Sequence, residues 1–167
     1  MSAPQQKEME MDSRQAIGQS LKAADMVCMS YLGDMNDQEL QRRPHAKCNS
    51  LYWQLGHLIL SEHKMVSQIA PGGMPQLPAG FAEAFASQPD PAAPTFNRDQ
   101  LFEVYRQQRA ATEAALAKTS DEQLDQPSGI HYAPTVGSVF SMQATHWLMH
   151  CGQWVIVRRE LDKPILI

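Results

Sequence analysis

The chain has 167 residues, 43% of them hydrophobic, and its formal net charge is −4. A chain of this length can bury one sizeable core, so we expect a single domain. The slight negative charge gives no general electrostatic reason to bind nucleic acid or an anionic membrane. No segment approaches the 18 consecutive apolar residues that indicate a membrane span.

The first residues, MSAPQQKEMEMDS, are polar and lack the charged-then-apolar pattern of a signal peptide. We therefore expect a flexible tail over residues 1–12, one domain over residues 13–167, and a cytoplasmic protein.

Helical spacing and capping residues predict the first two long helices. Ser13 can cap a helix over residues 14–32, in which the apolar side chains recur at helical spacing. Asn36 with Glu39 three residues later resembles a capping box and predicts a short helical turn. The second long helix should span residues 50–70 and end where a proline and two glycines follow.

A proline-rich segment over residues 71–94, with a brief helical stretch, predicts a long ordered loop or lid that shapes a site. Asn97 should cap a third long helix with most of its charges facing solvent. Ser120 can cap a further short turn, and the fourth long helix should run from 135 or 136 to 161. Strand signals are almost absent. The pattern predicts an all-α four-helix bundle with a long crossover connection between the second and third long helices.

Two histidines four residues apart on the last helix, His146 and His150, lie about 40° apart around its axis. Two such imidazoles can chelate a divalent transition metal, since the helix fixes both rings in advance. The alternative is a pair of core histidines satisfied by hydrogen bonds. His57 falls at the edge of the apolar stripe of the second long helix. That position suits a ligand, and it suits equally a half-exposed histidine without a role.

The segments SLYWQLGHLILSEHKM and THWLMHCGQWVIVRRELDKP resemble the two signature helices of the DinB-like superfamily, which includes YfiT-like proteins. In that family a histidine on the second helix and a late H-x-x-x-H pair bind one divalent metal. The resemblance covers residues 13–163. It implies a four-helix bundle of the DinB/YfiT-like type, often a homodimer, with metal ligands at His57, His146 and His150.

The resemblance also implies a reaction that depends on the metal. Three histidine ligands leave coordination positions open, as in catalytic rather than structural metal sites. The expected cofactor is one divalent transition metal, zinc or nickel, and the expected activity is that of a metal-dependent transferase or hydrolase. The metal would activate a water or a small thiol for attack on a small-molecule substrate. The alternative is a non-catalytic, stress-linked module that binds metal or a small ligand.

Several polar residues near these helices have two interpretations each. Glu62 is expected to pair with an arginine, or to support a metal ligand by accepting a hydrogen bond. Gln153 would donate to a metal-bound water or bond within the bundle. His131 and Tyr132 could line the pocket, although His131 is more simply an exposed loop residue, and His63 should also be exposed.

The sequence also gives expectations for two arginines, two tryptophans and the cysteines. Arg158 and Arg159 should lie at the end of the last helix, where their charges favour the helix dipole, or else recognise a substrate carboxylate. Trp147 and Trp154 should face neighbouring helices or a dimer partner. The cysteines are scattered and odd in number, which argues against a disulfide framework or a zinc site with paired cysteines. A nucleophilic Cys151 beside His150 is disfavoured, because adjacent helical positions diverge by about 100°.

Overall fold

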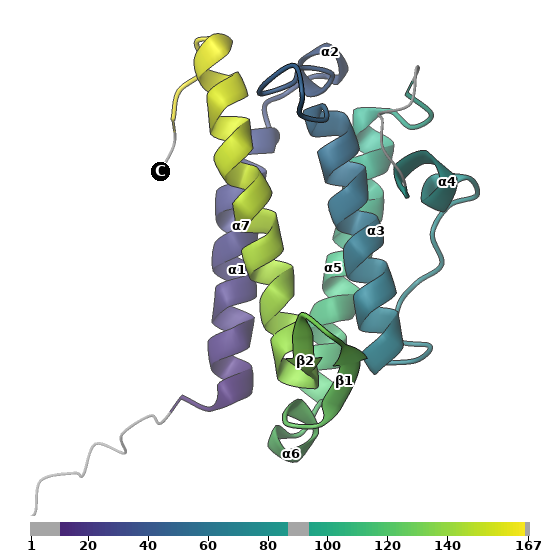
Figure 1. Ribbon diagram of the computed structural model, residues 1–167. Coiled ribbons are helices and arrows are strands. Elements are labelled where there is room, and N and C mark those ends of the chain that lie inside the picture. The colour runs from purple at the N-terminus through teal and green to yellow at the C-terminus, as the bar shows by residue number, and fades with distance from the viewer. Residues whose placement is uncertain (1–10, 87–93, 166–167) are drawn as a thin grey trace, which may run out of the picture.

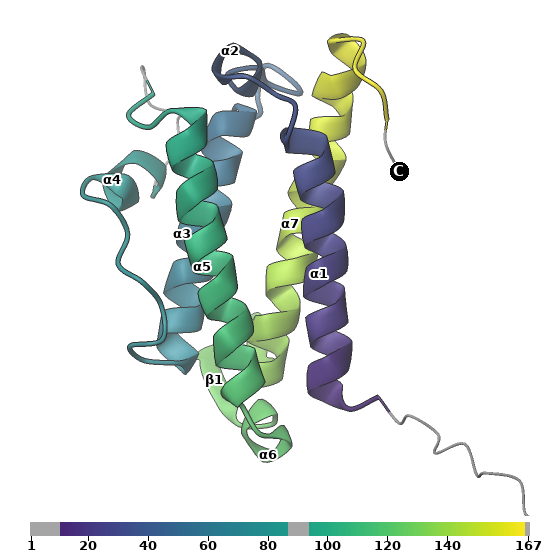
Figure 2. The same ribbon diagram turned by 180° about the vertical axis from the view of Figure 1, so that it is seen from behind.

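The computed structural model describes residues 11–86 and 94–165, and most of these residues are helical. Four long helices lie side by side and carry most of the chain (Figures 1 and 2). Ten residues of the predicted tail, 1–10, lie outside the described residues. The long helices are α1 (Ser13–Leu32), α3 (Leu51–Ile69), α5 (Arg98–Lys118) and α7 (Val136–Glu160).

Short elements occupy the connections between the long helices. The described connection between α3 and α5 includes α4, which lies outside the long helices in Figure 1. A small two-stranded antiparallel sheet precedes α7 and lies beside the beginning of that helix (Figure 1). The short elements are α2 (Asp37–Leu40), α4 (Phe81–Phe85), α6 (Asp121–Leu124), β1 (Pro127–Ile130) and β2 (Ala133–Thr135).

Capping side chains set where most helices begin. Asn36, Asn97 and Ser120 cap α2, α5 and α6, as predicted. The predicted cap of the first helix was wrong by one residue. Asp12 is the cap, because its carboxylate accepts a hydrogen bond of 2.8 Å from the Gln15 backbone amide while the Gln15 side chain accepts one from the Asp12 amide. A capping box of this kind satisfies two backbone donors that the helix leaves unpaired.

The sequence did not predict the two strands. They are only four and three residues long, which is too short for an alternating pattern to stand out. Gly129, within β1, has a φ of +77° that suits a residue without a side chain, and the Ser128 hydroxyl of the same strand donates to the Ala133 carbonyl of β2. The Ser128 carbonyl accepts a hydrogen bond of 3.0 Å from Gln68, so the hairpin is tied to α3.

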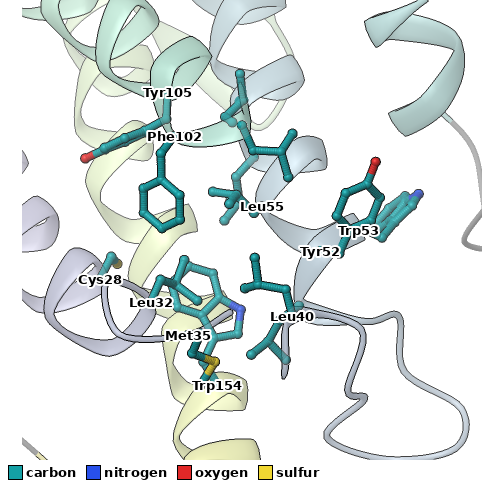
Figure 3. Close-up of a cluster of buried hydrophobic side chains, with 14 of the residues drawn as sticks. Cys28, Leu32, Met35, Leu40, Tyr52, Trp53, Leu55, Phe102, Tyr105 and Trp154 are labelled. Carbon is teal, nitrogen blue, oxygen red and sulfur yellow. The ribbon is translucent and has the colours of Figure 1, made fainter. Parts of the chain in front are cut away.

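The largest hydrophobic cluster joins all four long helices (Figure 3). Trp154 of α7 has no exposed surface and lies in this cluster with Leu32 of α1 and Leu55 of α3. Trp147 is also buried, so both tryptophans face neighbouring helices within the chain. None of the helices in the described part of the chain combines the length and apolarity needed to cross a membrane.

The third long helix turns most of its charges to solvent, as predicted, and Arg109 is the exception. Its guanidinium is buried and lies 3.1 Å from a carboxylate oxygen of Glu62 and 3.1 Å from one of Asp25. Glu62 also accepts hydrogen bonds from Thr112 and Trp147. The expected pairing of Glu62 with an arginine is therefore confirmed. Through Glu62 and Asp25, Arg109 joins α5 to α3 and to α1 inside the protein.

Arg158 lies in the last turn of α7, as expected, but it is buried there. Its side chain has no exposed surface, donates to the Tyr31 carbonyl at 2.7 Å and pairs with Asp34 at 2.5 Å. Two further hydrogen bonds reach the Pro164 carbonyl. Arg158 thus fixes the end of α7 to the end of α1, while Arg159 stays exposed.

Candidate metal centre

Three histidines from two helices meet at one point. His57 comes from α3, and His146 and His150 come from successive turns of α7. One ring nitrogen of each lies within 4.8 Å of the others. The ring centroids are 5.1 to 5.7 Å apart. The structure therefore brings together the three residues expected to bind metal, while their binding of a metal stays a prediction.

Packing on α3 holds the His57 ring. Trp53 lies one turn earlier on the same helix, and its ring stacks on His57 with a centroid distance of 4.8 Å and an interplanar angle of 8°. Because Trp53 is itself buried, the imidazole lies against a fixed surface. On α7 the four-residue spacing places His146 and His150 on one side of the helix, where both face α3.

Gln54 determines which nitrogen of His150 carries the proton. The Gln54 amide oxygen lies 2.9 Å from Nε1 of Trp154, which can only donate, so this atom is an acceptor. The same oxygen lies 3.0 Å from Nδ1 of His150. Nδ1 must therefore be the donor to Gln54. In the neutral ring Nε2 is then unprotonated and carries the lone pair that a metal requires.

The surroundings of all three imidazoles favour the neutral form. Burial, together with the nearby His57, lowers the pKa of His146 to about 4. Burial also lowers the pKa of His150 to about 4, with His146 and His57 adding to the shift. For His57 burial again lowers the pKa, with a smaller effect from the Lys64 charge. Neutral imidazole is the form that coordinates metals.

Two hollows open onto the histidines. The first, which we call the methionine pocket, has a volume of about 450 Å³. It is lined by His57, Ser61, Met65, Tyr132, Met142, Thr145, His146 and Met149. The second, which we call the polar hollow, has a volume of about 350 Å³. It is lined by Lys47, Cys48, Asn49, Trp53, Gln54, His57, His146, Met149, His150 and Gln153.

The other predicted site residues fall into two groups. Tyr132 lines the methionine pocket, whereas His131 is exposed and is not among the residues that line either hollow. Gln153 accepts a hydrogen bond of 3.2 Å from Gln54, which favours its role within the bundle. His63 was expected to be exposed but is half-buried, with Nδ1 3.0 Å from the Gln108 side-chain oxygen.

The proline-rich segment does not shape this site as expected. None of its described residues lines either hollow. Its helix α4 packs on α3 instead, where the fully buried Phe85 covers Gly56. The turn between the strands and the segment before α3 supply Tyr132 and Lys47 to the two hollows.

Sequence reasoning missed Gln54. The available signal was an amide side chain inside the apolar run LYWQLGHL, one turn before Leu58. A buried amide must find hydrogen-bond partners, so such a residue indicates a polar network. Its partners on α7 are distant in sequence and become visible only in the fold.

Comparisons with known proteins give a family match and a structure of similar fold. The family model of the DinB superfamily matches residues 20–154. A crystal structure of a conserved protein of locus from Enterococcus faecalis has a similar fold, with a TM-score of 0.68. The two sequences are 19% identical, and the match covers 92% of this chain and 100% of that chain. No curated protein matches the chain.

Proposed function

The chain belongs to the DinB superfamily, and we propose that it is a metal-dependent enzyme whose His57, His146 and His150 hold one divalent transition metal, zinc or nickel. The observation that carries this proposal is the convergence of three ring nitrogens within 4.8 Å of one another. Borderline metals prefer imidazole nitrogen, and the lowered histidine pKa values keep all three rings available near neutral pH.

The reaction we propose is a transfer or a hydrolysis that begins with a water or a small thiol as nucleophile. When bound by three protein ligands, a divalent metal keeps open coordination positions and lowers the pKa of a water or thiol placed there. The chain's own residues fix the site. Gln54 keeps the proton on Nδ1 of His150, and Trp53 holds the plane of the His57 ring.

We propose in addition that α1, α3, α5 and α7 form a four-helix bundle of the DinB/YfiT-like type, with the crossover between α3 and α5, in a single domain over residues 13–167. The packing of α3 against both α5 and α7 supports this assignment. A homodimer is part of the same proposal, and sedimentation of the purified protein tests it.

Metal content tests the site. The wild type and His150→Ala should be purified without a histidine tag, with His131→Ala as control because His131 is exposed and lies outside both hollows. We expect about one metal ion per chain in the wild type and the control, and little in His150→Ala. A wild type without stoichiometric metal contradicts the proposal.

Turnover tests the reaction. The metal-loaded protein is incubated with a panel of small thiols, electrophiles and hydrolysable esters and amides, and products are followed by mass spectrometry. We expect metal-dependent product with at least one pair of reactants, and none from the metal-free protein. A loaded protein that is inactive across the whole panel favours the alternative function, a non-catalytic module that binds metal or a small ligand.

A further inference from the structure

The described residues that line the methionine pocket include no aspartate, glutamate, lysine or arginine. Apart from two of the candidate ligand histidines, they are three methionines, a tyrosine, a serine and a threonine. Met65 forms a buried part of the lining, whereas 60% of Met149 and 68% of Tyr132 is exposed. Burying a carboxylate among such side chains would cost free energy, whereas burying an apolar group there is favourable.

Methionine also suits a pocket that accepts more than one shape. Its side chain is unbranched and polarisable and can adapt to different apolar surfaces. A volume of about 450 Å³ is within the range of pockets for small organic ligands. The pocket therefore suits an uncharged, largely apolar group of a small organic molecule.

The polar hollow has the opposite chemistry. Lys47, Asn49 and Gln153 are among its lining residues, and no aspartate or glutamate is among the described residues that line it. Gln54 donates 2.9 Å to the Asn49 carbonyl, so the wall that carries Lys47 is tied to α3. A cation with amide donors and no competing anion favours a carboxylate ligand.

The two hollows meet at the candidate metal centre, since His57, His146 and Met149 line both. We infer, on the basis of the proposed function, that they are two halves of one substrate site. The methionine pocket takes an uncharged apolar group, the polar hollow takes a carboxylate, and the reacting atom lies between them at the histidines. The substrates are then small molecules. Either one reactant carries both the apolar group and the carboxylate, or each of two reactants carries one of them.

The first test needs no metal. Metal-free protein labelled with ¹³C at the methionine methyl groups is titrated with benzyl alcohol and followed by NMR. We expect saturable shifts of the Met65, Met142 and Met149 signals, with the Met26 signal unchanged because Met26 is exposed on α1. No shift at the three pocket methionines, or an equal shift at Met26, overturns the pocket assignment.

The second test uses zinc-loaded protein and calorimetry with three thiols. Ethanethiol reports binding at the metal alone, 2-phenylethanethiol adds an apolar group, and 3-mercaptopropionate adds a carboxylate. We expect the phenyl group to improve affinity by about tenfold and the carboxylate by about threefold, since the Lys47 charge is exposed.

Two variants separate the halves. Met142→Glu should abolish the gain from the phenyl group and leave the carboxylate gain within about twofold, because its effect is local to the methionine pocket. Lys47→Glu should abolish the carboxylate gain and leave the phenyl gain. Met26→Glu and Lys118→Glu are the matched controls, since both residues are exposed and line neither hollow.

The outcomes distinguish this inference from the proposed function. If ethanethiol binds the zinc-loaded protein but the phenyl group adds nothing, or if each variant removes both gains, the inference is wrong and the metal site stands. If the protein takes up neither zinc nor nickel, the proposed function fails and the two-part substrate site fails with it. The benzyl alcohol titration then shows independently whether the methionine pocket binds apolar groups.

Discussion

The side-chain oxygen of Gln54 lies 3.0 Å from Nδ1 of His150 and makes that nitrogen a donor. Partners of this kind orient a metal ligand and raise its basicity. Gln54→Ala should therefore weaken metal affinity by roughly 10- to 100-fold. Competition with a chelator of known affinity measures the effect. Gln107→Ala is the control, because Gln107 is exposed on α5 and bonds to Glu103. Unchanged affinity in Gln54→Ala would show that the hydrogen bond does not support the site.

The lowered histidine pKa values predict how the metal-free protein responds to acid. In the unfolded chain a histidine titrates at about 6.5, whereas in the folded protein the pKa of His146 and of His150 is about 4. Between these values the unfolded chain binds more protons, so the free energy of unfolding falls as the pH is lowered from about 6.5 to 4. Above about pH 6.5 the two histidines are neutral in the folded and in the unfolded state, so they no longer lower the free energy of unfolding.

Chemical denaturation at several pH values in the presence of a chelator checks this prediction. The double variant His146→Asn with His150→Asn should lose less stability over the same interval, because two titrating groups are gone. His131→Asn should follow the wild type, since that ring is exposed. Parallel curves for the double variant and the wild type would assign the acid sensitivity to other groups.

Local signals in the sequence predicted much of the fold. Asn36, Asn97 and Ser120 cap helices where expected, because a cap depends on residues only three positions away. The grouping of His146 with His150 follows from the geometry of one helix. Periodicity could not place His57 beside them. That step rested on the family resemblance, and the packing of α3 on α7 brings the rings together.

Contacts between distant segments account for what the sequence did not predict. Arg109 lies on the same side of α5 as the buried Tyr105 and Leu116, but a charged residue is normally predicted to be exposed to solvent. Its burial depends on Glu62 and Asp25, which come from two other helices. Gln54 is similar, since its partners His150 and Trp154 are on α7.

The buried Arg109 predicts a large loss of stability on removal. Arg109→Met would leave Glu62 and Asp25 inside the protein without their cation, and such unpaired buried charges typically cost about 3 to 5 kcal/mol. Arg106→Met, three residues earlier, removes an exposed pair with Glu103 and should cost less than about 1 kcal/mol. Denaturant unfolding of both variants measures the difference. Equal losses would mean that the buried pair contributes no more than a surface pair.

Two helical glycines should respond to alanine in opposite directions. A Cβ at Gly56 would lie 2.3 Å from the buried ring of Phe85, so Gly56→Ala must shift that ring or the helix α4 that carries it. Overpacking of this kind costs about 1 to 3 kcal/mol. At Gly152 a Cβ meets no atom within 4 Å among the described residues, and alanine favours the helix by about 0.5 to 1 kcal/mol. Gly152→Ala should therefore be more stable than the wild type.

Thermal unfolding of the two alanine variants gives the sign of each change. A companion variant, Gly56→Ala with Phe85→Ala, separates overpacking from an effect on the helix itself. Removing the ring leaves room for the new methyl group but costs the burial of Phe85, which on its own is worth about 3 to 5 kcal/mol. Gly56→Ala should then cost much less in the Phe85→Ala background than in the wild type, because the clash is gone. An equal cost in both backgrounds would mean that contact between α3 and α4 does not require glycine at position 56.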